Sequence, residues 1–166
     1  MSDKPANVRI FAVNSRFQQM ARRPGGVPRE IAIAQAQAHI DDYRTDFVDW
    51  VERELQALSD TFYSAEGSAI GEAKIADMYR LCCQLRDTGT TMGLTLLTFV
   101  SDNLCRVLDA IRSGATYDPA MIECHIDALA LARKEPYRSM SPDHFPDMTR
   151  GLQRVLERAT RQVMND

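Results

Sequence analysis

Apolar residues recur at every third or fourth position through five successive stretches of this 166-residue chain. That spacing places them on one face of an α-helix, whereas a half-buried β-strand would need them at every second position. Alternation of the second kind is almost absent, so the sequence predicts an all-α protein. Helices of this length joined by short loops pack against one another as an antiparallel bundle.

The five helices are predicted over residues 28–62, 70–87, 92–112, 119–135 and 147–164. Asp118 is typical of an N-cap and Pro119 of a first helical residue, while Gly114 is typical of a helix end. Residues 64–68 are expected to form a turn. Helix breakers crowd residues 22–28, so residues 1–27 are predicted to be a lead-in segment and residues 28–166 the helical bundle domain.

The same spacing predicts which side chains face the core. They are Ile33, Ile40, Tyr43, Phe47, Trp50, Leu58 and Phe62 in the first helix, Ile75, Met78, Cys82 and Leu85 in the second, Leu96, Phe99, Val100, Leu104, Val107, Leu108 and Ile111 in the third, Ile122, Ile126 and Leu129 in the fourth, and Met148, Leu152, Val155, Leu156, Ala159 and Val163 in the fifth.

Composition and charge exclude several classes of protein. The net charge of -3 is too small for a general nucleic-acid or membrane binder, and no apolar run reaches the ~18 residues of a membrane-spanning helix. We see no secretory signal. The four cysteines, Cys82, Cys83, Cys105 and Cys124, lie inside apolar helical patterns rather than in a disulfide framework, so we expect a cytoplasmic protein.

Motifs for catalysis, metals and cofactors are missing from the sequence. We find no HExxH, P-loop, GxGxxG or GxSxG motif, and the cysteines lack the CxxC spacing of a zinc site. The sequence therefore favours a signalling or protein-binding module over an enzyme, with no cofactor and no metal.

One segment carries more specific information. Residues 83–93 read Cys-Gln-Leu-Arg-Asp-Thr-Gly-Thr-Thr-Met-Gly. The run resembles a bacterial form of the histidine phosphotransfer (HPt) domain, in which it reads His-Asp-Leu-Lys-Gly-Gln-Gly-Gly-Thr-Phe-Gly. Leu85, Gly89, Thr91 and Gly93 match, and residues 103–105 parallel a later segment of the family.

The resemblance extends over about residues 25–135 and implies both a fold and a role. The fold is an antiparallel four-helix bundle, here with an additional C-terminal helix and the N-terminal lead-in. The role is that of a domain that passes a phosphoryl group between receiver-domain aspartates in two-component signalling.

The departures from the family pattern argue against phosphotransfer. The family's phosphorylated histidine falls on Cys83, and an ordinary thiol is mostly protonated at neutral pH. Arg86 keeps the positive charge of the family's lysine. Asp87 replaces a small glycine and lies one helical turn from Cys83, where a carboxylate would repel a phosphoryl group. The resemblance therefore implies a degenerate HPt domain that keeps the fold and has lost phosphotransfer.

Recognition is the role that such a domain can retain. The resemblance implies a receiver domain or a histidine kinase as the partner, and we expect neither a membrane nor a nucleic acid. The alternative is that this face of the second helix is an ordinary solvated surface that binds no partner. The partner-binding residues would be Arg80, Cys83, Gln84, Arg86 and Asp87.

Three other functions stay open from the sequence. The first is an active phosphorelay protein that uses another histidine, for which His125 is the candidate. The second is a thiol-based sensor, which requires Arg80 and Arg86 to lower the pKa of the Cys83 thiol; an inert cysteine in place of the family's histidine is favoured over it. The third is a structural homodimer formed through spare apolar surface. The arginines of the last helix, Arg150, Arg154, Arg158 and Arg161, are expected to form a solvated face with i,i+4 ion pairs rather than a site for an acidic partner.

Overall fold

The computed structural model of the protein describes residues 16, 19, 25–64 and 70–164. The chain divides into two compact units, Met1–Asp41 and Asp42–Asp166. Helix α2 (Arg29–Asp42), which accounts for most of the described part of the first unit, buries none of its residues. The buried apolar residues of the described chain all belong to the second unit. The domain boundary predicted after residue 27 stays a prediction.

The described residues of the second unit form five α-helices and two short 3-10 helices. The α-helices are α3 (Arg44–Tyr63), α4 (Glu72–Thr91), α5 (Thr95–Arg112), α6 (Pro119–Ala132) and α7 (Pro146–Met164), and η1 (Tyr137–Ser139) and η2 (Pro142–His144) lie between α6 and α7. Across the described residues there is no β-strand, and the prediction of an all-α protein is confirmed.

The ends of the helices follow from local chemistry. The Asp118 side chain accepts a hydrogen bond from the backbone N–H of Ala120 at 3.1 Å, and Pro119 begins α6, as predicted. Gly114 follows the end of α5 with a φ of +109°, and Gly93 follows α4 with a φ of +72°. Residues other than glycine rarely adopt such φ angles. Glycine at these two positions therefore permits the turns that end α4 and α5.

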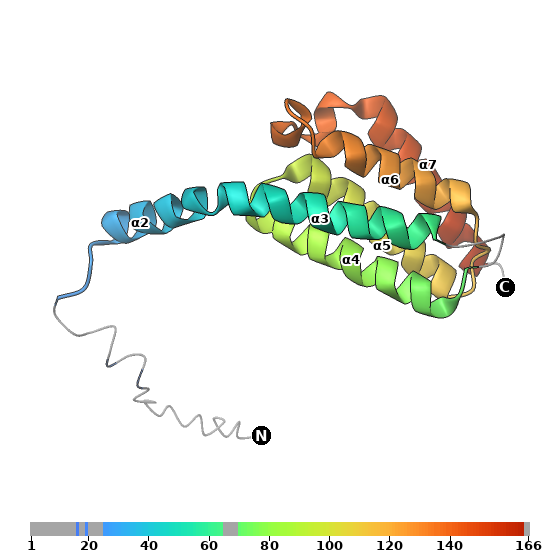
Figure 1. The fold of residues 1–166 in the computed structure, drawn as a ribbon, viewed down its shortest axis with the longest axis horizontal. Coiled ribbons are helices and arrows are strands. Elements are labelled where there is room, and N and C mark those ends of the chain that lie inside the picture. The colour runs from blue at the N-terminus through green and yellow to red at the C-terminus, as the bar shows by residue number, and fades with distance from the viewer. Residues whose placement is uncertain (1–15, 17–18, 20–24, 65–69, 165–166) are drawn as a thin grey trace, which may run out of the picture. The chain divides into compact units, whose positions relative to one another are not determined.

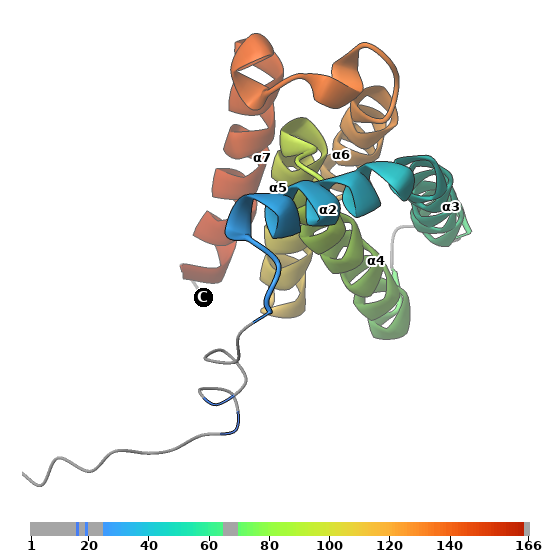
Figure 2. The ribbon, with the colours of Figure 1, turned by 90° about the vertical axis from the view of Figure 1, so that its left-hand side faces the viewer.

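Helix α5 lies among the other helices of the unit. It contacts α4, α6 and α7, while α3 contacts both α4 and α6. Helices α3 to α7 run in alternating directions (Figure 1), and an end-on view places α5 between α7 and α4 (Figure 2). The predicted core residues that are buried in α4 to α7 are Ile75, Met78, Cys82, Leu85, Leu96, Val100, Leu104, Val107, Leu108, Ile111, Ile122, Ile126, Leu129, Leu152, Leu156 and Ala159.

The first predicted helix needs correction. A turn at Tyr43 divides it into α2 and α3, and the Ile33, Ile40 and Tyr43 side chains are exposed. Farther along, Leu58 is fully buried, as predicted. The prediction failed in α2 because its isoleucines and alanines are spread around the helix and give it no apolar face to bury.

The second helix is also longer than predicted and continues to Thr91. Threonine and glycine are weak helix formers, which is why the prediction stopped at residue 87. In the structure the Thr90 hydroxyl donates to the carbonyl of Arg86 at 2.8 Å, and the Thr91 hydroxyl donates to that of Asp87 at 3.1 Å. The turn predicted at residues 64–68 lies, beyond Ser64, outside the described residues.

Candidate functional site on helix α4

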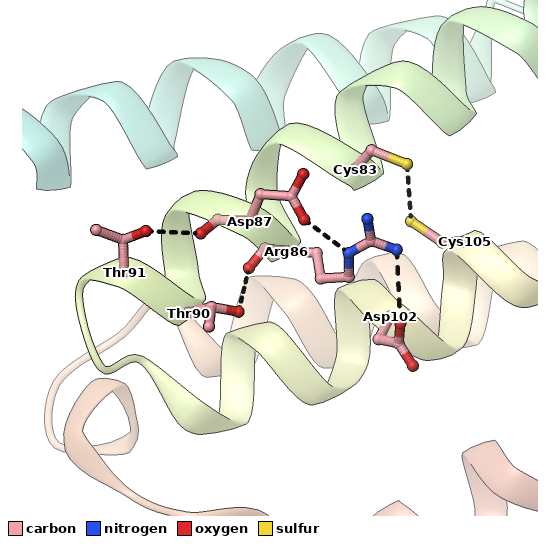
Figure 3. A network of polar contacts seen from close by, with 7 residues as sticks. All are labelled: Cys83, Arg86, Asp87, Thr90, Thr91, Asp102 and Cys105. Carbon is pink, nitrogen blue, oxygen red and sulfur yellow. Dashed lines mark hydrogen bonds and ion pairs between the residues drawn. The ribbon is translucent and has the colours of Figure 1, made fainter. Parts of the chain in front are cut away.

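The predicted partner-binding residues lie in the middle of α4 and fall into two groups. Arg80, Gln84 and Asp87 are exposed and follow one another along the outer face of the helix. We call these three residues the outer row. Cys83 and Arg86 are half-buried and turn toward the neighbouring helix α5 (Figure 3). The structure therefore places all five residues on one part of α4, but only the outer row faces solvent fully.

The outer row is a solvated surface with weak internal contacts. The Arg80 guanidinium donates a hydrogen bond to the Gln84 side-chain oxygen at 3.1 Å. It also lies 4.0 Å from the Asp77 carboxylate, and the two side chains are 59% and 63% exposed. Exposed pairs of this kind contribute ~0–1 kcal/mol to stability, so little holds the Arg80 side chain in place. It is free to change partners on binding.

Cys83 does not point away from the protein as a phosphorylated residue would have to. Its sulfur lies 3.6 Å from the sulfur of Cys105 on α5. Burial raises the pKa of the Cys83 thiol above its usual value, and contact with Cys105 raises it further. The Tyr79 hydroxyl and the Arg86 charge act in the opposite direction without reversing the shift. Arg86 therefore lowers this pKa as expected, but burial and Cys105 outweigh it and the net shift is upward.

Arg86 lies between two carboxylates. Its Nε donates to Asp87 at 2.9 Å, and its guanidinium lies 3.6 Å from the carboxylate of Asp102 on α5 (Figure 3). The hydrogen bond to Asp87 is the main reason that the pKa of Arg86 is raised. At neutral pH one guanidinium and two carboxylates carry one net negative charge. The positive charge that resembled the family's lysine is thus already compensated, and the surroundings disfavour an anionic phosphoryl group.

Asp102 and Cys105 were missed as members of this site. Both lie on α5, one helical turn apart, and they meet α4 only because of how the two helices are rotated about their axes. Apart from the parallel of residues 103–105 with the family, their sequence signal was the i,i+3 spacing of a carboxylate and a thiol on a predicted helix, which has no meaning until the facing helix is known.

Among the histidines, His125 is buried and cannot replace the missing acceptor. It has no exposed surface, its Nδ1 lies 2.6 Å from the carbonyl oxygen of Met121, and its Nε2 lies 2.8 Å from the side-chain oxygen of Asn103. Burial lowers the pKa of His125 to about 4, so the imidazole is neutral at physiological pH. A phosphoryl donor has no access to either nitrogen.

The neutral ring also fixes the orientation of Asn103. A neutral imidazole has one N–H, which donates from Nδ1 to Met121 at the short distance of 2.6 Å. Nε2 is then an acceptor and needs a donor opposite it. Turning the Asn103 amide by half a turn brings its NH₂ against Nε2, and the two orientations of an amide differ only in which atom is oxygen and which is nitrogen. We therefore assign Asn103 as the donor in this buried pair.

A hollow adjoins the site where α4 ends and α5 begins. Gly89 permits the two helices to approach closely there, because a Cβ at this position would lie 2.9 Å from the Thr98 side-chain oxygen. Asp102 links the hollow to the Arg86 group. The lining residues are Gly89, Thr90, Gly93, Thr95, Thr98, Phe99 and Asp102.

The arginines of α7 form a solvated face, as expected. Arg161 pairs with Glu157 at 3.8 Å and Arg150 with Asp147 at 3.6 Å, while Arg158 reaches Asp118 at 3.9 Å. These arginines are more than half exposed, so the pairs add little to stability. They do not form part of the α4 site.

The described residues contain no group of three or more histidine, cysteine or acidic side chains arranged to hold a metal ion. Within the same part of the chain, no helix combines the length and the apolar character that crossing a membrane requires. No protein-family model, no curated protein and no solved structure matches the chain.

Proposed function

We propose that the protein is a degenerate HPt-like signalling module that binds a receiver domain through the middle of α4 and transfers no phosphoryl group. The observation that carries this proposal is the identity and the surroundings of the residue at position 83. The residue that aligns with the family's phosphorylated histidine is a half-buried cysteine whose sulfur contacts a second cysteine.

The arrangement of helices supports an HPt-like fold. Helix α3 contacts α4, α4 contacts α5, α5 contacts α6, and α6 returns to α3. A closed ring of four helices with alternating directions is the arrangement of an antiparallel four-helix bundle. In this reading α7 is the additional C-terminal helix, packed against α5 and α6.

The chemistry of the site supports the loss of phosphotransfer. A thiol attacks phosphorus as a thiolate, and the raised pKa of Cys83 keeps it protonated at neutral pH. Asp87 and Asp102 add a net negative charge where the anionic group would have to arrive. The alternative relay through His125 is disfavoured because that ring is enclosed in the core.

The outer row and the hollow beside it are the surface offered to the partner. Receiver domains are phosphorylated on an aspartate in an acidic pocket, so an exposed arginine such as Arg80 is a fitting contact for their surface. Gln84 adds both a donor and an acceptor one helical turn away. Asp87 then sets charge selectivity at the other end of the row.

The test combines binding with phosphotransfer. The protein is incubated with receiver domains from the same genome, carrying labelled phosphate, and both retention and label are scored. We expect retention without label. Arg80→Ala and Gln84→Ala should each weaken binding by about tenfold, which corresponds to ~1.4 kcal/mol. Arg154→Ala, on the exposed face of α7, is the matched control and should bind normally.

Three results would contradict the proposal in different ways. Acid-labile label on the protein would mean that it does transfer phosphate. Retention by histidine-kinase domains but by no receiver would keep the docking function and replace the partner. If neither class of domain is retained, the HPt-like role is wrong and only the helical fold remains.

A further inference from the structure

A pair of cysteines bridges the two helices that build the candidate site. Cys83 on α4 and Cys105 on α5 place their sulfurs 3.6 Å apart (Figure 3). A disulfide needs about 2.05 Å between sulfurs, so the atoms would have to approach by roughly 1.5 Å. Small side-chain rotations can supply such a movement. The contact joins α4 and α5, which share the most extensive interface in the unit.

We propose that Cys83 and Cys105 are a modification site: a hydroperoxide oxidises them to an intramolecular disulfide, and thiols reduce it. The pair differs from the other cysteines in geometry. Cys124 lies on α6, where its sulfur contacts Met121 and His125 rather than another thiol. Cys82 adjoins the pair but has no exposed surface, whereas Cys83 is half-buried and open on one side to a small oxidant.

The surroundings assign different roles to the two thiols. A hydrogen bond from Cys82, and then one from Cys83 and the charge of Arg86, lower the pKa of Cys105 although the residue is buried. The same network and the burial raise the pKa of Cys82 and of Cys83. Cys105 is therefore the better thiolate and Cys83 the more accessible sulfur. Access therefore lets Cys83 meet the oxidant first, and Cys105, the thiolate beside it, resolves the product.

The reaction takes place in two balanced steps. The small fraction of Cys83 that has lost its proton to water attacks the terminal oxygen of the hydroperoxide, and the raised pKa of this thiol makes the first step slow. The O–O bond breaks, a sulfenic acid forms on Cys83, and the second oxygen leaves as an alcohol or as water. The Cys105 thiolate then attacks the Cys83 sulfur, forms the S–S bond and displaces hydroxide, which takes up a proton and leaves as water. Two electrons pass from the two sulfurs to the peroxide, and a dithiol returns them by exchange.

The disulfide can be located because trypsin separates the two cysteines. Cleavage after Arg80, Arg86 and Arg106 puts Cys83 on peptide 81–86 and Cys105 on peptide 87–106, while Cys124 falls on peptide 113–133. The full chain is treated with hydrogen peroxide, its remaining thiols are alkylated, and the monomer band of a non-reducing gel is digested. Peptide 81–86 also contains Cys82, which the alkylation step modifies. We expect this peptide, with one alkylated cysteine, to be joined to peptide 87–106 with a mass two hydrogens lower than their sum, and the two to separate after dithiothreitol.

Variants identify the partners of the bond. Cys83→Ser and Cys105→Ser should lose the joined peptides, whereas Cys124→Ser and Cys82→Ala should keep them. Cys83→Ser is the decisive variant because its side chain is only half-buried and the fold should tolerate it. A link kept in Cys83→Ser and lost in Cys82→Ala assigns the bond to Cys82 and overturns the proposal. Joined peptides found only in a dimer band, or fully alkylated cysteines after peroxide, overturn it as well.

The inference is independent of the proposed partner. It concerns the free protein, and its failure would leave receiver binding by the outer row untouched. If the disulfide forms, oxidation links α4 covalently to α5 beside Arg86. Melting temperatures of the oxidised and reduced protein supply a second measurement, since a cross-link between helices should raise the melting temperature of the wild type and leave that of Cys83→Ser unchanged.

Discussion

Neighbouring side chains on α4 have very different surroundings. Cys82 is fully buried, Cys83 is half-buried against Cys105, and Gln84 is exposed. Helical geometry turns each successive residue by about 100°, which is why three consecutive positions reach the core, the seam with α5 and the solvent. A residue in the position of Cys83 therefore interacts with a neighbouring helix as much as with any partner.

Buried polar side chains give the clearest prediction at the residue scale. His125 has a pKa of about 4 in the folded protein and an ordinary pKa of about 6.5 when unfolded. Between these values the unfolded chain binds a proton that the folded chain does not, so unfolding becomes easier as the pH falls through this window. The free energy of unfolding should decrease by up to about 3 kcal/mol from pH 7 to pH 4 on account of His125 alone.

The measurement compares urea unfolding of the wild type and of His125→Gln over this range of pH. Carboxylates also titrate near its lower end, so the informative quantity is the difference between the two proteins. We expect the wild type to lose more stability than the variant between pH 6.5 and pH 4.5. Parallel pH profiles would mean that His125 has the same pKa in the folded and the unfolded chain and takes up a proton in both, and the donor assignment of Asn103 would then lose its basis.

Individual helices depend on contacts that their own sequence does not reveal. Gly89 lies inside α4, where alanine would ordinarily be favoured by ~1 kcal/mol. A Cβ there would lie 2.9 Å from the Thr98 side-chain oxygen on α5. We expect Gly89→Ala to destabilise the protein by about 1–2 kcal/mol, because the clash outweighs the helix propensity.

The control for that substitution is Gly151→Ala. Gly151 also lies inside a helix, α7, but it is exposed and a Cβ would meet no atom within 4 Å. This variant should be more stable than the wild type by about 0.5–1 kcal/mol. Adding Thr98→Ala to Gly89→Ala should recover part of the loss. Equal stabilisation by both glycine substitutions in urea unfolding would contradict the close approach of α4 and α5.

The start of α6 allows a second prediction for an element. Asp118→Ala removes the side chain that accepts from the Ala120 N–H, and urea unfolding should show a loss of about 1 kcal/mol. Asp127→Ala, an exposed substitution within the same helix, is the control and should cost nothing. Arg158→Ala tests the other contact of Asp118, whose pairing distance of 3.9 Å implies a negligible contribution. A loss in Arg158→Ala as large as in Asp118→Ala would attribute the effect to the ion pair.

The sequence pattern predicted which segments are helices, but it did not predict which helices contact one another. The apolar spacing of α4 correctly placed Ile75, Met78, Cys82 and Leu85 in the core, because burial needs only one apolar face. The contact between Cys83 and Cys105 could not be predicted from the sequence. It depends on the rotation of α5 against α4, which the Gly93 turn and the close approach at Gly89 help to set. Ile33 and Ile40 were misplaced because the apolar residues of α2 are spread around the helix and give it no face to bury.

At the scale of the whole molecule, the described core belongs to one unit. The buried apolar residues extend from Phe47 to Ala159, and α2 contributes none of them. We therefore predict that a fragment of residues 42–166 folds cooperatively and unfolds in urea at nearly the same midpoint as the full chain. A large loss of stability in this fragment would mean that residues 1–41 take part in the fold.

Removal of α7 from the same fragment is the contrasting change. Leu152, Leu156 and Ala159 are buried, and α7 packs on α5 and α6. Burial of each leucine side chain contributes ~1.5–3 kcal/mol, and loss of α7 would also expose the apolar surface of α5 that it covers. Because domains are stable by only about 5–15 kcal/mol, residues 42–145 should be mostly unfolded or aggregated at room temperature. Circular dichroism and size-exclusion chromatography of the two fragments test this directly. A soluble, cooperatively folded 42–145 fragment would show that α3 to α6 form a complete bundle, with α7 an addition that the core does not need.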